Sequence, residues 1–253
     1  MKEFNIDRLE VRIYDDRVNM GREAADLVCK KITELLAQKE FVNIIFAAAP
    51  SQNEFLGALI KNPAVDWTRV NAFHMDEYIG LAENAPQRFG LFLNDKLFGH
   101  LPFHTVSYID GNADPVTECG RYAELLSEFP PDIVCMGIGE NGHIAFNDPH
   151  VADFNDPLLV KVIDLDLACR QQQVNDGCFS NLNDVPKHAI TLTVPALMSG
   201  KSVYCMVPGK NKARAVHDTL QNAIDERCPA SILRNHPDAI LFLDEDSAGM
   251  LNL

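Results

Sequence analysis

Positive charge is scarce in this 253-residue sequence, in which 22 Lys and Arg residues stand against 36 Asp and Glu residues. The net charge of −14 repels nucleic acid phosphates and anionic membranes unless a local basic patch compensates for it. No run of Lys or Arg residues supplies such a patch. We therefore expect neither a nucleic acid nor a membrane surface as a partner.

Long apolar runs are also missing. No stretch of about 18 apolar residues, the length that spans a membrane, occurs in the sequence. Residues 1–8 lack the apolar core of a secretory signal. The seven cysteines are odd in number and include no C-x-x-C pair, and several lie in apolar runs, where a thiol behaves as a small hydrophobic group. These features predict a cytoplasmic protein in a reducing compartment.

The composition that remains, 47% hydrophobic and 23% charged, is ordinary for a globular protein, and we expect a single domain over residues 1–253. Short apolar runs predict strands at Leu9–Tyr14, Phe41–Ala48, Val70–His74, Thr105–Ile109, Ile133–Ile138, Leu159–Ile163, Ala189–Val194, Val203–Val207 and Ala239–Leu243. Helical periodicity predicts helices at Val18–Leu36, Gln52–Ile60, Phe89–Phe98, 115–129 and Lys210–Gln221. This alternation predicts a three-layer α/β/α, Rossmann-like fold with a mostly parallel central sheet.

Two helix starts have recognisable caps. Ser51 and Glu54 have the S-x-x-E spacing of a capping box, which predicts a helix that begins at Ser51 with free backbone N–H groups at its mouth. Asp114 and Pro115 form a good N-cap and first-turn pair for the helix that follows them.

The segment Ile133–Pro149 combines a buried strand with a glycine-rich turn that bears His143 and Asp148. Gly137–Gly142 formally matches the dinucleotide-binding G-x-G-x-x-G pattern, but that site needs a helix that opens inside the motif. Here the chain runs into Asn-Asp-Pro, a turn signature, so we disfavour a dinucleotide site. A loop histidine is often merely solvated; its proximity to a carboxylate favours a proton-handling pair.

Two other strand ends carry polar groups. Asp76 and Glu77 follow the strand Val70–His74 at the position where parallel sheets bind ligands, although they could equally cap a turn. Lys210 and Lys212 follow the pair Pro208-Gly209. They could form a solvated basic face, but the tight turn favours a cation directed inward toward an anionic substrate.

Two long segments, Asn71–Leu81 and Gly137–Pro149, resemble the F-N-M-D-E-Y-x-G-L and G-x-G-x-D-G-H-I-A-F-N-E-P segments of glucosamine-6-phosphate deaminases. Val185–Thr191 and Gly209–Ala213 match the same family in order and spacing, so the similarity spans nearly the whole chain. The superfamily also contains 6-phosphogluconolactonases, and the sequence Ile-Ala-Phe-Asn after His143 favours the deaminase branch.

The resemblance implies that glucosamine 6-phosphate, or an epimer, is converted with water to a ketose 6-phosphate and ammonia, without a metal or organic cofactor. By the match, His143 moves a proton during ring opening, Asp76 takes the proton from C2, and Lys212 holds the phosphate. Asn141 and Asp148 occupy the positions of the acids that accompany the histidine. The resemblance implies further substrate contacts at Ala49, Ser51, Gln52, Glu77 and Gly139.

Several positions depart from the family pattern. Asn141 replaces an Asp, Asp148 replaces a Glu, and Ala48–Gln52 replaces a Thr-Gly-Gly/Ser-Thr-Pro phosphate loop. A family arginine that binds phosphate has no counterpart in Asn175–Cys178, and Leu158–Val160 replaces the basic residues of the allosteric site of some members. These departures leave open a lactonase or isomerase of another phosphosugar, and a non-catalytic phosphosugar sensor. A homo-oligomer is also left open.

Overall fold

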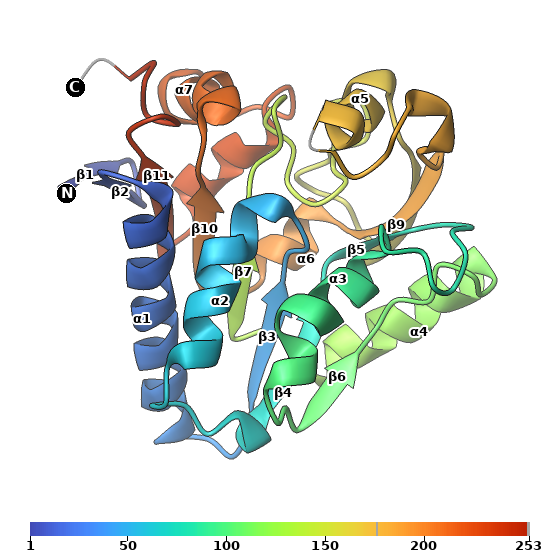
Figure 1. Ribbon diagram of the computed structural model, residues 1–253, viewed down its shortest axis with the longest axis horizontal. Helices are drawn as coiled ribbons and strands as arrows, with labels where there is room; N and C mark the ends of the chain where they lie inside the picture. The colour runs from blue at the N-terminus through green and yellow to red at the C-terminus, as the bar shows by residue number, and fades with distance from the viewer. Residues whose placement is uncertain (176, 252–253) are drawn as a thin grey trace.

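The computed structural model describes residues 1–175 and 177–251, and its centre is an eight-stranded sheet (Figure 1). The strands run across the sheet in the order β1 (Lys2–Ile6), β2 (Leu9–Tyr14), β11 (Ala239–Asp244), β10 (Ser202–Val207), β7 (Ile133–Met136), β3 (Val42–Phe46), β4 (Val70–His74) and β6 (Thr105–Ser107). Only the β1–β2 pair is antiparallel among these described neighbours. The carboxyl ends of the other strands therefore meet at one edge, where α/β sheets bind ligands.

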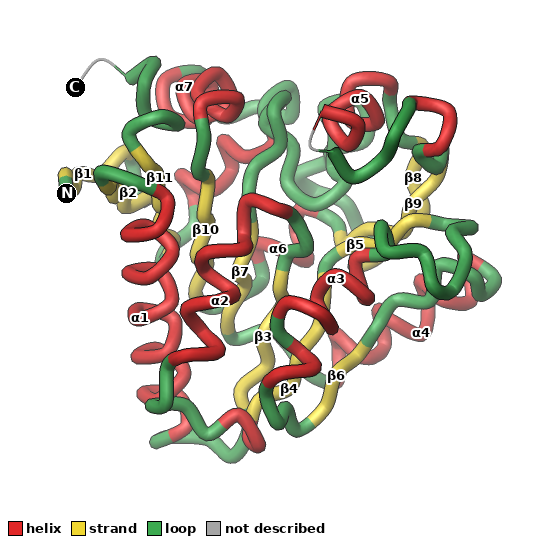
Figure 2. The backbone as a smooth tube through the Cα atoms, viewed as in Figure 1, coloured by secondary structure: helices red, strands yellow, loops and turns green. Residues whose placement is uncertain are grey.

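Helices cover both faces of this sheet. Figure 2 shows the first group in front of the strands, namely α1 (Arg17–Leu36), α2 (Asn53–Lys61) and α3 (Phe89–Lys96). The opposite face packs against α4 (Pro115–Glu128), α6 (Val194–Met198) and α7 (Ala213–Gln221). The strands β3, β4, β7 and β10 are buried along their entire length, as unbroken apolar runs predict for strands covered on both sides. The predicted three-layer fold is confirmed.

A second, antiparallel sheet lies beside the first. It consists of β5 (Asp76–Tyr78), β9 (His188–Leu192) and β8 (Val160–Asp164), and α5 (Leu167–Asn175) follows β8. The apolar runs predicted β8 and β9 as strands but not that they leave the main sheet, because periodicity reports burial and not the identity of the neighbouring strand.

One predicted helix start is wrong and the other is confirmed. The chain makes a 3₁₀ turn at Pro50–Gln52, and α2 begins at Asn53 without a side-chain cap. The expected capping box does not form because the carboxylate of Glu54 pairs with Arg17 of α1. In contrast, the carboxylate of Asp114 accepts a hydrogen bond from the backbone N–H of Thr117 at 2.9 Å.

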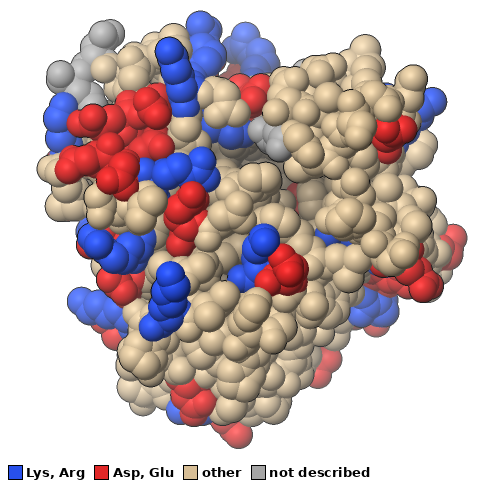
Figure 3. All heavy atoms as spheres, viewed as in Figure 1, with Lys and Arg blue, Asp and Glu red and all other residues tan. Residues whose placement is uncertain are grey.

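The surface is mixed in charge. Acidic and basic side chains are interspersed on the face seen in Figure 3, and acidic groups gather beside the chain ends. Among the described residues, no helix is both long enough and apolar enough to cross a membrane.

Candidate active site

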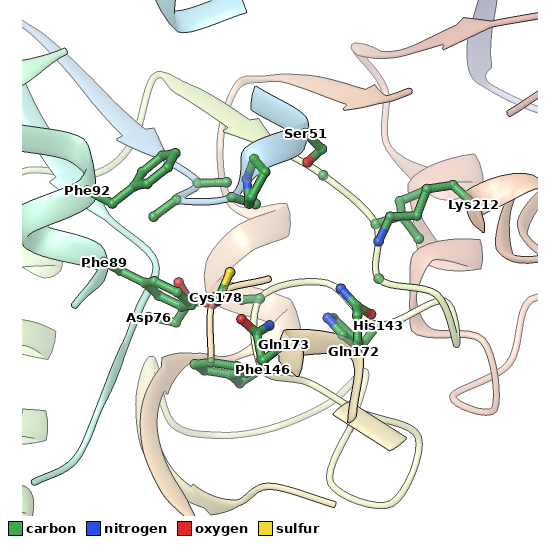
Figure 4. Close-up of a pocket in the computed structure, with 18 of the residues that line it drawn as sticks. Ser51, Asp76, Phe89, Phe92, His143, Phe146, Gln172, Gln173, Cys178 and Lys212 are labelled. Atoms are coloured by element: carbon green, nitrogen blue, oxygen red, sulfur yellow. The ribbon is translucent and has the colours of Figure 1, made fainter. Parts of the chain in front are cut away.

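A pocket of about 570 Å³ opens at the carboxyl edge of the main sheet, and Gln172 and Gln173 of α5 form part of its wall (Figure 4). The residues predicted from the sequence that line it are Ala49, Ser51, Asp76, Gly139, His143 and Lys212. The predicted residues that do not line it are Gln52, Glu77, Asn141 and Asp148. The structure therefore brings together groups from four separate segments of the chain, as the strand-end positions predicted.

Asp76 is the first residue of β5, and its side chain is only 6% exposed. Burial, with a smaller contribution from the neighbouring Glu77, raises the pKa of Asp76 well above its usual value. The stacked rings of Phe89 and Phe146, whose centroids are 5.5 Å apart, belong to the apolar side of the same pocket. A carboxylate in such surroundings is poorly hydrated, and it can remove a weakly acidic proton from a bound substrate.

The buried side chain of His74 holds the backbone at Asp76. Its Nε2 accepts a hydrogen bond from the N–H of Ile109 at 2.9 Å, so its Nδ1 carries the proton and donates it to the carbonyl oxygen of Asp76 at 2.9 Å. Burial lowers the pKa of His74 to about 4. His74 is therefore a neutral brace at neutral pH and not a proton donor to the pocket.

His143 lines the pocket and belongs to a buried hydrogen-bonded cluster whose other members lie outside the pocket lining. Its Nδ1 lies 2.8 Å from Asn141 Oδ1 and 3.0 Å from Asp148 Oδ1. Both neighbours are oxygen acceptors, so Nδ1 carries the proton and Nε2 of the neutral ring keeps a lone pair. Asn141 Nδ2 also donates to Asp148 Oδ1 at 2.8 Å. Burial alone would raise the pKa of Asp148, but the hydrogen bond and electrostatic attraction of His143, with the bond from Asn141, hold that pKa below its usual value.

The helix α5 adds Cys169 to this cluster. The ligand atoms of His143, Asp148 and Cys169 all lie within 4.8 Å of one another, a spacing compatible with a metal ion as well as with a hydrogen-bonded relay. Burial raises the pKa of the Cys169 thiol, and the negative charge of Asp148 raises it further. A protonated thiol beside a carboxylate favours the relay, and the absence of a metal cofactor stays a prediction.

Two glycines shape the loop that carries His143. A Cβ atom added at Gly139 would lie 2.2–2.4 Å from atoms of the His143 ring, so only glycine allows the ring to sit there. Gly142 has φ +85°, in the left-handed region that glycine tolerates best. No helix begins between Gly137 and Pro149, all of which are described, so the geometry of a dinucleotide site is not formed.

Lys212 reaches the pocket through a tight turn. Gly209, with φ +99°, donates its N–H to both carboxylate oxygens of Asp244 at 3.0 Å, which fixes the turn to the end of β11. Lys212 is 6% exposed and its ammonium group points into the pocket (Figure 4). Lys210 is exposed and does not line the pocket. Of the two lysines, Lys212 is therefore the inward cation.

The turn before α2 contributes a hydroxyl group. Ser51 Oγ accepts a hydrogen bond from Gln52 Nε2 at 3.2 Å, so its own O–H is available for a ligand. Gln52 Nε2 also donates to the carbonyl oxygen of Met206 at 3.1 Å, so this side chain braces the turn from behind. We do not propose that Gln52 contacts the substrate, because the residue is 1% exposed and does not line the pocket.

Glu77 has a structural position. Its carboxylate accepts hydrogen bonds at 3.0 Å from the backbone N–H groups of Tyr78, Phe89 and Gly90, and two of these lie at the start of α3. Burial raises the pKa of Glu77 although these bonds lower it. Glu77 does not line the pocket, so we do not propose that it contacts the substrate. It instead caps the start of α3, which is the alternative that the sequence left open.

Residues 15–242 match the family described as glucosamine-6-phosphate isomerases/6-phosphogluconolactonase. The chain belongs to this family. A glucosamine-6-phosphate deaminase of Listeria welshimeri is 37% identical over 238 residues, which cover 94% of this chain and 97% of that protein. The solved structure of a monomeric glucosamine-6-phosphate deaminase is 29% identical, with a TM-score of 0.87 over 95% of this chain and 99% of that chain. A 6-phosphogluconolactonase of Thermotoga maritima shares the fold at 20% identity and a TM-score of 0.76, covering 92% of this chain and 98% of that chain.

Two residues around His143, Asn141 and Asp148, differ from the acids of the family pattern. Asn141 places its carbonyl oxygen against Nδ1, and the negative charge comes from Asp148, whose shorter side chain still approaches Nδ1 to 3.0 Å. The segment Asn175–Cys178 stands where the family has its phosphate-binding arginine. Asp176 lies outside the described residues, whereas Cys178 lines the pocket.

Sequence reasoning missed five polar residues of the pocket, Arg17, Gln87, Gln172, Gln173 and Asn211. Arg17 could have been found, because it comes shortly after the carboxyl end of β2, which belongs to the same sheet edge as the other sites. Gln172 and Gln173 lie on α5, and Gln172 accepts a hydrogen bond from the N–H of Glu140 at 2.8 Å. No sequence pattern placed α5 over the pocket.

Proposed function

We propose that this protein is an amino-sugar phosphate deaminase that converts glucosamine 6-phosphate, or an epimer, and water to a ketose 6-phosphate and ammonia. The observation that carries the proposal is the convergence of Asp76, His143 and Lys212 on one pocket. Together they offer a desolvated base, a neutral imidazole and a cation for the phosphate. Membership in the family and relatives named glucosamine-6-phosphate deaminase support it.

The proposed reaction begins with ring opening. The proton on the hydroxyl group at C1 passes to Nε2 of His143 and then to the ring oxygen as the C1–O bond breaks. The imidazolium that forms transiently is stabilised by Asp148, whose carboxylate lies 3.0 Å from Nδ1. Asn141 Oδ1 accepts from the same Nδ1 and fixes the orientation of the ring.

Asp76 acts on the open chain. Its carboxylate takes the proton from C2 while the carbonyl oxygen at C1 takes the proton of the substrate's ammonium group, and an enolamine forms between C1 and C2. The carboxyl group of Asp76 then returns its proton to C1, which leaves a protonated imine at C2, and water hydrolyses this imine to the ketose and ammonium. Because burial raises the pKa of Asp76, the free enzyme loses activity as the pH falls through that raised value. The acid limb of the pH profile of kcat/KM is expected above the usual range of an Asp.

Ammonia release measures the proposed activity directly. Purified protein is incubated with glucosamine 6-phosphate and with galactosamine 6-phosphate, and ammonia and the ketose 6-phosphate are quantified in equal amounts. Asp76→Asn serves as the inactive reference, and Asp110→Asn, an exchange of an exposed acid that does not line the pocket, as the matched control. Absence of ammonia from both substrates would overturn the assignment.

A second candidate is a lactonase or isomerase of another phosphosugar, which the altered turn at residues 48–52 suggests and which the relatives support less than the deaminase. Product analysis over a panel of phosphosugars separates it from the deaminase. A non-catalytic sensor, the third candidate, would bind a phosphosugar tightly without turnover.

We also propose an oligomeric state and a cellular location. The solved relative is a monomeric enzyme, and we propose the same state for this chain in place of the homo-oligomer left open by the sequence. Size-exclusion chromatography with light scattering measures it. The cytoplasmic location rests on the seven cysteines, none of which forms a disulfide in the described part of the chain, and stays a proposal.

A further inference from the structure

Arg17 is the second cation of the pocket. Of the described residues that line it, Arg17 and Lys212 are those with a Lys or Arg side chain. A phosphate monoester carries about −1.5 to −2 charges at pH 7. One lysine neutralises about half of that charge, so a site for such a group calls for another donor of positive charge.

The guanidinium group of Arg17 is held in one orientation. Its Nε lies 2.8 Å from Glu54 Oε1, and its Nη2 donates to Glu54 Oε2 at 2.9 Å and to the carbonyl oxygen of Pro50 at 3.3 Å. Both hydrogen bonds come from Nη2, whereas Nε faces Glu54 as an ion pair and makes no hydrogen bond. In the described part of the chain Nη1 also has no hydrogen-bond partner. A guanidinium group has five N–H donors in a planar fork. Two donors therefore remain available on a group whose orientation is already fixed.

The turn that carries Ser51 is connected to the segments of both cations. Arg17 donates to Pro50, the residue before Ser51, from the side of α1. On the other side, Gln52 links the turn to Met206 at the end of β10, and the chain continues from there to Lys212. Arg17, Ser51 and Lys212 all line the same pocket.

The alternative role of Arg17 is purely structural, as a pair that joins α1 to α2. A half-exposed ion pair contributes only about 0–1 kcal/mol. The Arg17 side chain is 43% exposed, and Asp16 does not compete for it, because the Asp16 carboxylate accepts from Asn19 as the cap of α1. The structural pair thus accounts for the contacts with Glu54, but not for the place of Arg17 in the pocket lining with Nη1 unpaired.

We infer that Arg17 is a specificity-determining residue that binds the substrate phosphate together with Lys212 and Ser51. Glu54 acts as the positioning residue that fixes the arginine fork. The inference rests on the proposed function for the identity of the substrate, but it predicts binding of a phosphate group whether or not turnover follows.

The experiment measures binding of inorganic phosphate by calorimetry, in parallel with KM and kcat for glucosamine 6-phosphate. The variants are Arg17→Gln, Arg17→Lys and the matched control Arg22→Gln, which removes an arginine of the same helix that pairs with Glu23 and does not line the pocket. Loss of a charge-assisted hydrogen-bond donor is expected to weaken phosphate binding roughly tenfold to a hundredfold in Arg17→Gln.

The expected pattern is a raised KM with a smaller change in kcat, an intermediate effect for Arg17→Lys, and wild-type behaviour for Arg22→Gln. Binding of unphosphorylated glucosamine should not change. Equal phosphate affinity in Arg17→Gln and wild type overturns the inference, as does an equal loss for glucosamine. Thermal melting confirms folding, and Arg17→Lys, which keeps the charge facing Glu54, serves if the glutamine variant does not fold.

The same data separate this inference from the proposed function. If the protein releases ammonia but its phosphate affinity does not depend on Arg17, the inference about Arg17 is wrong and the deaminase assignment stands. If phosphate affinity depends on Arg17 but no ammonia is released, the deaminase assignment is wrong and the anion site stands.

Discussion

Replacing Asn141 with Asp restores the acid that the family has at this position, yet the structure predicts that the change harms this protein. Asn141 Nδ2 donates to Asp148 Oδ1 at 2.8 Å, so an Asp would place a second carboxylate oxygen across the same gap. Two full charges at that distance repel each other by about 6 kcal/mol at an effective dielectric constant of about 20. Protonating one ordinary carboxyl group at pH 7 costs about 4 kcal/mol. Because protonation costs less than the repulsion, the pair of carboxyl groups at positions 141 and 148 takes up one proton.

The sign of the stability change follows from this proton. The folded variant has a carboxyl group with a raised pKa, so its stability matches that of the wild type at low pH and is lost as the pH rises through the raised value. Thermal melting at about pH 5 and about pH 8 measures the effect. Asn222→Asp is the matched control, because Asn222 Nδ2 donates to Asp218 Oδ1 at 3.0 Å in an exposed position where water screens the charges.

A double variant tests the same reasoning from the other side. Exchanging the two side chains, Asn141→Asp with Asp148→Asn, keeps one negative charge within reach of His143 Nδ1 and is expected to recover the pH dependence of the wild type. The coupling is refuted if Asn141→Asp alone melts with wild-type pH dependence and releases ammonia faster at every pH.

Three other changes have definite outcomes. Asp76→Asn should slow ammonia release at least roughly 10²- to 10⁴-fold and raise the melting temperature at neutral pH, because a buried group whose raised pKa opposes ionisation is replaced by a neutral amide; unchanged turnover would remove Asp76 from the mechanism. Gly139→Ala should abolish activity because its Cβ would meet the His143 ring, whereas Gly57→Ala, with nothing within 4 Å, should not. Dialysis against EDTA should leave the rate unchanged, and a loss restored by Zn²⁺ would show that the cluster with Cys169 holds a metal.

The sequence predicted those parts of the site that lie at the ends of buried strands. The apolar runs before Asp76 and His143 located the carboxyl edge of the sheet, and the pair Pro208-Gly209 located the turn that directs Lys212 inward. These inferences depend on local periodicity and turn chemistry, which a sequence displays directly.

What the sequence did not predict depends on tertiary packing. Glu54 had the spacing of a cap, but α1 packs against α2 and offers Arg17 as a stronger partner. The adjacency of Glu77 and Asp76 in the sequence predicts that both reach the substrate. Successive residues of a strand point to opposite sides, however, and Glu77 reaches the start of α3. The position of α5 over the pocket follows from the antiparallel sheet that precedes it, a pairing that no local pattern encodes.

The chain passes from the main sheet to the small sheet at Met75, and this junction divides the pocket mechanically. Asp76 begins β5 and is linked through β9 to β8, which leads directly into α5. Asp76 and α5 therefore belong to one hydrogen-bonded unit, whereas Ser51 and Lys212 belong to the edge of the large sheet. In the proposed reaction, a shift of the small sheet would change the distance between C2 and Asp76 without disturbing the residues proposed to hold the phosphate.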